Sequence, residues 1–126
     1  SHDDVTPGTG DMRVVMNKAT PADTAALLFQ TGFPGRAELG TAGDDKLHLK
    51  LSPDGTTWAE AFVADPATGR IALSAPLGLA SSTIAGLPAA TPPGQLLYVS
   101  NESGGPVVAF SDGTNWRRVT DRAVVS

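Results

Sequence analysis

The chain has 126 residues, a length typical of one domain or of two very small ones, and its net charge is −4. It has no cysteine, which excludes disulfides and thiol catalysis. The largest basic cluster is Arg117-Arg118, and no apolar run approaches the length of a membrane span, so neither nucleic-acid binding nor membrane insertion is expected.

Material for a hydrophobic core is scarce. The hydrophobic fraction is 40%, but it includes 18 alanines, and only 33 residues carry a bulky apolar side chain. Apolar burial contributes roughly 25 cal/mol per Å², against about 1 to 2 kcal/mol of backbone entropy per ordered residue, so a lone copy is expected to be marginally stable. Without disulfides or an evident metal cluster, we expect copies of the chain to complete one another's core.

The N-terminal third predicts short extended segments. Residues 1–10 are interpreted as a flexible lead-in, in which Ser1 and His2 resemble the remnant of a tag. MRVVM at residues 12–16 is a candidate first strand. AALLFQ at residues 25–30 is predicted as a strand, because the turn residues TGFPG cut it too short for a stable helix. The first β module is placed at residues 11–74.

The middle of this module predicts a hairpin. In KLHLKL, Leu47, Leu49 and Leu51 alternate with His48 and Lys50, the period-two pattern of a half-buried strand. SPDG follows, with proline and aspartate in favoured turn positions and glycine for a left-handed backbone. This composition predicts a three-residue connection between antiparallel strands.

The same turn chemistry recurs near the C-terminus. SPDGTTW at residues 52–58 is echoed by SDGTNW at residues 111–116, and similar flanking segments accompany both copies. We interpret the echo as two short four-stranded antiparallel meanders, the second at residues 95–126. The uncharged, alanine-rich and proline-rich residues 75–94 are expected to form an extended, partly packed bridge. The predicted fold class is therefore all-β, with two meanders stacked along a trimeric axis.

Two tryptophans follow the repeated turns, and each has two interpretations. The rings of Trp58 and Trp116 can stack on a sugar, or they can pack across strands, which is the commoner role of such residues. Arg117 can grip an anionic sugar, although such residues usually form salt bridges. With the neighbouring Asp112 and Asn115, these three residues are the candidate ligand-binding set.

Catalysis has no positive signal in the sequence. A glycosidase needs two carboxylates facing each other across a sugar, and nothing selects a pair among the carboxylates of the predicted modules. These are Asp44, Asp45, Asp54, Glu60, Asp65, Asp112 and Asp121. His48 has no second plausible histidine or cysteine beside it, which makes a metal site or a catalytic base unexpected. No cofactor is predicted.

Several of these segments resemble a known class of virion proteins. NKATPADTAALLFQTGFPGRAELG, SPDGTTW with DPATGR, and GQLLYVSNESGGPVVAFSDGTNWRRVTDRAVVS occupy most of residues 17–126. They resemble the C-terminal region of tail-fibre and head-spike proteins from alphaproteobacterial phages and gene transfer agents. GGPVVAFSDGTNWRR is the most distinctive part. The resemblance implies a trimeric, β-rich module of the virion, assembled in the bacterial cytoplasm, that contacts other head or tail proteins and a host surface polysaccharide.

Three functions follow as expectations. The leading one is host attachment without catalysis, in which several weak sugar contacts become strong through multivalency. The second is a trimerisation or capping module with no receptor site of its own. The third is a polysaccharide depolymerase with a carboxylate pair in a groove, either within one subunit or shared between subunits.

Overall fold

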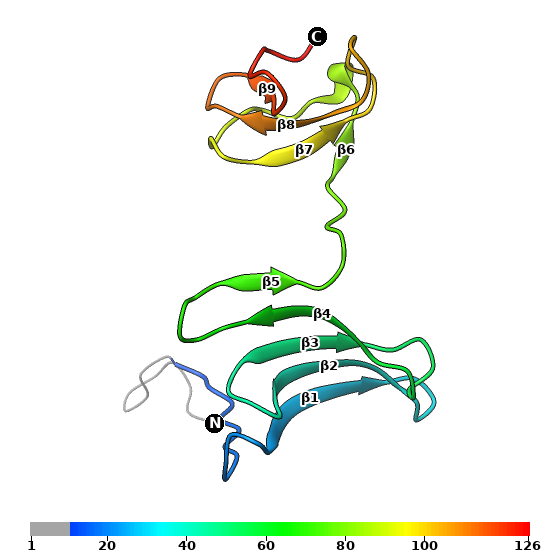
Figure 1. Ribbon diagram of the computed structural model, residues 1–126, viewed down its shortest axis with the longest axis vertical. Helices are drawn as coiled ribbons and strands as arrows, with labels where there is room; N and C mark the ends of the chain where they lie inside the picture. The colour runs from blue at the N-terminus through cyan, green and yellow to red at the C-terminus, as the bar shows by residue number, and fades with distance from the viewer. Residues whose placement is uncertain (1–10) are drawn as a thin grey trace. The chain divides into compact units, whose positions relative to one another are not determined.

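The computed structural model describes residues 11–126, and it confirms the all-β prediction (Figure 1). Within these residues there is no α-helix, only a 3-10 turn, η1, at Ile84–Gly86. The chain forms two compact units, of which the first ends at Pro76 and the second runs from Leu77 to Ser126. The predicted lead-in at residues 1–10 lies outside the described residues.

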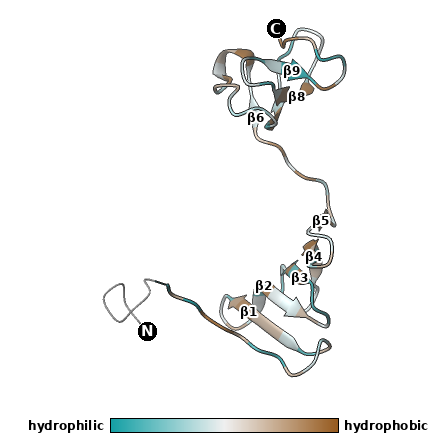
Figure 2. Cartoon of the chain, turned by 90° about the vertical axis from the view of Figure 1, so that its left-hand side faces the viewer, coloured by the Kyte–Doolittle hydropathy of each residue, from teal (hydrophilic) through white to brown (hydrophobic). Residues whose placement is uncertain are grey.

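The first unit contains one five-stranded antiparallel sheet. Its strands follow one another in chain order, each paired with the next. They are β1 (Thr24–Gln30), β2 (Gly35–Ala42), β3 (Leu47–Leu51), β4 (Ala59–Ala64) and β5 (Ile71–Leu73). The strand prediction for residues 25–30 is confirmed by β1. The sheet forms a single layer, with no other strand or helix of this unit lying over it (Figures 1 and 2).

Period-two alternation gives this sheet two different faces. Apolar register partners form a row across all five strands: Leu27, Leu39, Leu49, Phe62 and Leu73. The same side of the pleat carries Ala25, Phe29, Ala37, Thr41, Leu47, Leu51, Ala59, Ala64 and Ile71. We call this side the apolar face.

The opposite side, the polar face, carries charged side chains, which the register partners on the apolar face lack. Its strand residues include Leu28, Glu38, His48, Lys50, Glu60 and Val63. A β-bulge between Leu49 and Lys50 keeps Phe62 on the apolar face and Glu60 on the polar face. The predicted segregation of leucines from His48 and Lys50 in β3 is thereby confirmed.

The second unit contains a smaller mixed sheet in the order β6-β7-β8-β9. Its strands are β6 (Ser81–Ser82), β7 (Leu96–Val99), β8 (Val107–Ser111) and β9 (Trp116–Arg118). The last three form an antiparallel meander, whereas β6 pairs in parallel with β7. An isolated bridge between Arg117 and Val124 attaches the C-terminal segment to this sheet.

This second unit has a closed hydrophobic core. Its buried members are Ala90, Leu97, Val99, Ala109, Trp116 and Val125, with Ile84, Leu87 and Val107 packed against them. Trp116 is only 5% exposed, and its indole Nε1–H donates to the carbonyl of Pro88 at 2.7 Å. Residues 75–94, expected as an extended, partly packed bridge, thus include β6, η1 and part of this core.

The structure differs from the sequence-based expectations in three respects. Residues 12–16 form no strand, because no strand in the described part of the chain pairs with them. The first meander has five strands and not four, and the second unit includes a parallel strand. The two hairpin connections, residues 52–58 and 112–115, are longer than three residues, because aspartate side chains extend the turns.

Replacing Trp116 with alanine should unfold the second unit. The wild-type ring is buried, and the substitution also removes its hydrogen bond to Pro88, so we expect a destabilisation of about 3–5 kcal/mol. This is a large share of the free energy of unfolding expected for so small a unit. Amide NMR spectra should show collapsed dispersion for residues 77–126, with Trp116→Phe retaining it. A spectrum of Trp116→Ala that matches the wild type would contradict this account of the core.

Candidate functional site

The first repeated turn is organised by a carboxylate. Asp54 accepts hydrogen bonds from the amides of Thr57 and Thr56 at 2.7 and 2.8 Å. These amides, that of Thr57 first, hold the pKa of Asp54 well below its usual range. Gly55 has a φ of 86°, and an added Cβ would lie 2.9 Å from the Cβ of Pro34. The β3–β4 connection therefore packs against the turn between β1 and β2.

The second repeated turn uses the same hydrogen bonds. Asp112 accepts from the amides of Asn115 and Thr114 at 2.7 and 2.8 Å, and Arg117 Nε also donates to it. The Asn115 amide, then Arg117 and the Thr114 amide, lower the pKa of Asp112 to about 2. The Arg117 guanidinium also donates to the carbonyl of Arg122 at 3.0 Å.

The five predicted ligand-binding residues have different surroundings. Asp112, Asn115 and Arg117 are brought together, but within the hydrogen-bonded turn and not around an open groove. Trp116 packs in the core, so its ring offers no flat surface to a ligand. For Trp116 the packing interpretation is therefore the one that the structure supports.

Trp58 differs, because its ring reaches the surface. The side chain is 38% exposed, and its Nε1–H donates to the carbonyl of Gly55 at 3.3 Å. The ring rests on the backbone of Gly35, where an added Cβ would lie only 2.7 Å from Cζ2 of Trp58 and 3.3 Å from Leu28. The indole is thus held on the polar face by a glycine that leaves room for it.

A shallow groove lies beside this ring. Its volume is about 310 Å³, and Lys50, Trp58, Ala59 and Glu60 line it. Lys50 lies 4.0 Å from Glu38, and Glu60 is bound to His48, so charged groups on the polar face border the indole. An aromatic surface flanked by an ammonium group and a carboxylate can stack on a sugar ring and bind its hydroxyl groups. This groove is the candidate functional site.

A second exposed aromatic side chain lies at the same end of the sheet. Phe33, in the turn between β1 and β2, is 90% exposed and has a φ of 82°. Gln30 Nε2 donates to the carbonyl of Phe33 at 2.5 Å and fixes the turn. Positive φ is unusual for an aromatic residue, and such backbone is often found at functional positions.

Sequence reasoning missed Lys50 and Glu60 as members of this site, and it also missed Phe33 as an exposed aromatic residue at the same end of the sheet. For Phe33 a signal was available, because an aromatic residue between glycine and proline in TGFPG lies in a turn and cannot reach a core. Lys50 and Glu60 meet only through the register of β3 with β4, which includes a bulge. A bulge cannot be located from alternation alone.

His48 connects two of the seven carboxylates considered in the sequence, Asp44 and Glu60. Its Nε2 lies 2.7 Å from Asp44, and its Nδ1 binds Glu60. Although it belongs to the polar face, His48 is buried, at 9% exposure. The hydrogen bond with Asp44, and then that with Glu60, raises the pKa of His48 despite its burial, and in turn His48 lowers the pKa of Asp44.

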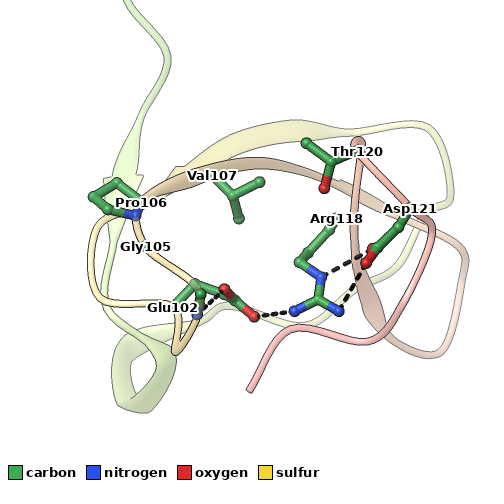
Figure 3. Close-up of a pocket in the computed structure, with 8 residues that line it drawn as sticks. Glu102, Gly105, Pro106, Val107, Arg118, Thr120 and Asp121 are labelled. Carbon is green, nitrogen blue, oxygen red and sulfur yellow. Dashed lines mark hydrogen bonds and ion pairs between the residues drawn. The ribbon is translucent and has the colours of Figure 1, made fainter.

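A second cleft, in the second unit, is filled by its own ion pairs. Glu102, Arg118 and Asp121 line about 300 Å³ of space (Figure 3). Arg118 binds both oxygens of Asp121, at 2.9 and 3.0 Å, and Glu102 at 2.6 Å. The amide of Gly104 also donates to Glu102, and this bond, followed by Arg118, lowers the pKa of Glu102. Because two carboxylates already bind the guanidinium of Arg118, these ion pairs stabilise the fold. They leave little positive charge in the cleft with which to bind an anion.

Other kinds of site have no counterpart among residues 11–126. No group of three or more histidine, cysteine or carboxylate side chains there is arranged to hold a metal ion. In the same residues no helix has the length and apolar character needed to cross a membrane. Comparisons with protein-family models, curated proteins and solved structures find no match for this chain.

The raised pKa of His48 predicts a pH-dependent contribution to stability. Because the folded sheet favours the protonated ring, the contribution is complete below the ordinary pKa of 6.5 and is lost as the pH rises through the raised value. In an NMR titration, His48 should titrate above 6.5, and Asp44→Asn should lower its midpoint.

Asp45→Asn is the matched control, because the neighbouring Asp45 pairs with Lys18 at 3.1 Å. It should leave the titration of His48 almost unchanged. A wild-type midpoint at or below 6.5, or equal effects of the two substitutions, would contradict the proposed network.

Proposed function

We propose that the chain is a non-catalytic attachment module of a virion fibre or spike, which binds a polysaccharide of the host-cell surface as a homotrimer. The observation that carries the proposal is the exposed ring of Trp58, held in place above Gly35 and bordered by Lys50 and Glu60. The resemblance of residues 17–126 to fibre and spike proteins supports the virion setting and contacts with other head or tail proteins.

The chemistry of the groove favours a saccharide as the ligand. The indole supplies an apolar surface of the kind that stacks on the C–H face of a pyranose. Lys50 can donate hydrogen bonds to hydroxyl or carboxylate oxygens, and Glu60 can accept them from hydroxyl groups. The groove is shallow, so a single copy is expected to bind weakly, and three copies are expected to gain affinity through avidity on a repetitive polymer.

A specific observation favours a second candidate, a structural trimerisation or capping module. The described residues of the first unit have a broad apolar face and form no closed core, which is the property expected of a part that folds only in an assembly. In that case Trp58 only packs against Gly35, and the receptor site belongs to another part of the particle.

Substitution of Trp58 distinguishes the two candidates. Because stacking contributes about 1 kcal/mol per site and three sites act together, Trp58→Ala should weaken binding to a surface polysaccharide by roughly 10-fold or more. Tyr98→Ala is the matched control, since Tyr98 is an aromatic residue of the second unit with nearly the same exposure, 39% against 38%. Binding is measured on a glycan array and on encapsulated host cells.

Three outcomes decide between the functions. Loss of binding with Trp58→Ala, and not with Tyr98→Ala, supports attachment through the groove. A wild-type trimer that binds no host envelope component contradicts attachment and favours the structural module. Release of new reducing ends from the polysaccharide contradicts the non-catalytic part of the proposal.

A further inference from the structure

The apolar face of the first sheet is exposed to an extent unusual for strand residues. Leu27 is 49% exposed, Phe29 55%, Ile71 66% and Leu73 50%, and all four lie on strands at the two edges of the sheet. The register partners on this face include no charged residue, and Thr41 is the only polar one. At one end of the face, Asp45 and Asp65 of adjoining turns line a groove with Leu47 and Ile71. Monomeric proteins rarely leave so continuous an apolar surface in water.

Among residues 11–76, no element of the first unit covers this face. All five strands belong to the one layer, and every buried hydrophobic residue among those described, from Ala90 to Val125, lies in the second unit. A sheet with one apolar face is stable only when another layer packs on it. The second layer is therefore expected to come from outside residues 11–76.

The size of the face fits an interface between proteins. The five strands have 7, 8, 5, 6 and 3 residues, and with a rise of about 3.3 Å per residue and a strand spacing of about 4.8 Å they give a footprint on the order of 450 Å². Two such faces in contact would cover roughly 900 Å² of flat footprint, close to the roughly 1,000 Å² expected of a biological interface. Because side chains enlarge the accessible surface beyond this flat footprint, the face is large enough for such an interface.

We propose that the apolar face of the first unit is covered by the apolar faces of other copies of the chain, packed around a common symmetry axis. A face whose strand residues carry no charge can pack on its equivalents without any unpaired or repelling group there, which a symmetric contact requires. The polar face is less suited to such a contact, because burial would remove Glu38, His48, Lys50 and Glu60 from water. The second unit, in contrast, buries a core of its own.

This inference deepens the proposed function, because it assigns the contact that assembles the fibre module to one face of one unit. It restricts to the first unit the expectation that copies of the chain complete one another's core. It also leaves the polar face and the Trp58 groove directed away from the contact, so that each copy keeps its own candidate saccharide site.

Two neighbouring residues provide a matched test. Leu27 and Leu28 are both leucines of β1, with exposures of 49% and 50%, but they belong to opposite faces of the sheet. Leu27→Glu places like charges inside the proposed contact and should weaken self-association roughly 100-fold or more. Leu28→Glu should leave self-association unchanged. Molar mass is measured for the whole chain by sedimentation equilibrium across the micromolar range.

The copy number separates this inference from the proposed function. A wild-type trimer that Leu27→Glu dissociates supports both. A wild-type dimer that responds in the same way supports the interface and contradicts the homotrimer. A monomeric wild type at micromolar concentration overturns the interface, as does a loss of mass with Leu28→Glu alone, because another occupant then covers the face.

Cross-linking keeps the inference testable if Leu27→Glu fails to fold. The chain contains no cysteine, so Leu49→Cys introduces a single thiol at the centre of the apolar face. Mild oxidation with diamide should join two copies through this thiol. The control Lys50→Cys, one residue away on the polar face, should remain uncross-linked. Cross-linking through Lys50→Cys and not through Leu49→Cys would overturn the proposal.

Discussion

A single layer of five strands with one apolar side imposes the main physical constraint on this protein. Strand pairing satisfies the backbone, but Leu27, Leu39, Leu49, Phe62 and Leu73 gain little from it while their row is in contact with water. In the second unit, by contrast, apolar side chains are buried in a core of its own that includes Trp116. The two units therefore differ in how they are stabilised, although they share a turn motif.

The repeated turns show that local chemistry and tertiary environment are set by different interactions. Asp54 and Asp112 accept the same pair of backbone amides, and a glycine with positive φ follows each aspartate. The tryptophans four residues later nevertheless diverge. Trp116 reaches the carbonyl of Pro88, whereas Trp58 rests on Gly35 at the surface. One copy of the motif builds a core, and the other presents a ring beside a groove.

Much of the first sheet could be predicted from its sequence. Alternation in KLHLKL gave the orientation of Leu49 and His48, and proline, aspartate and glycine marked the turn that follows. Other features depend on distant contacts and could not be predicted. The burial of Trp116 requires a segment 28 residues away that has no periodic pattern. The strand predicted at residues 25–30 joins the first meander as its fifth strand, because β1 pairs with β2 along its whole length, and alternation alone does not reveal that pairing.

The central claim is that the first sheet depends on other copies of the chain and the second sheet does not. Hydrogen–deuterium exchange measured at increasing chain concentration tests it directly, because amide protection reports local stability. We predict that protection of β1 to β5 rises with concentration, while protection of β7 to β9 stays constant. Protection of both sheets that is strong and independent of concentration would contradict the account.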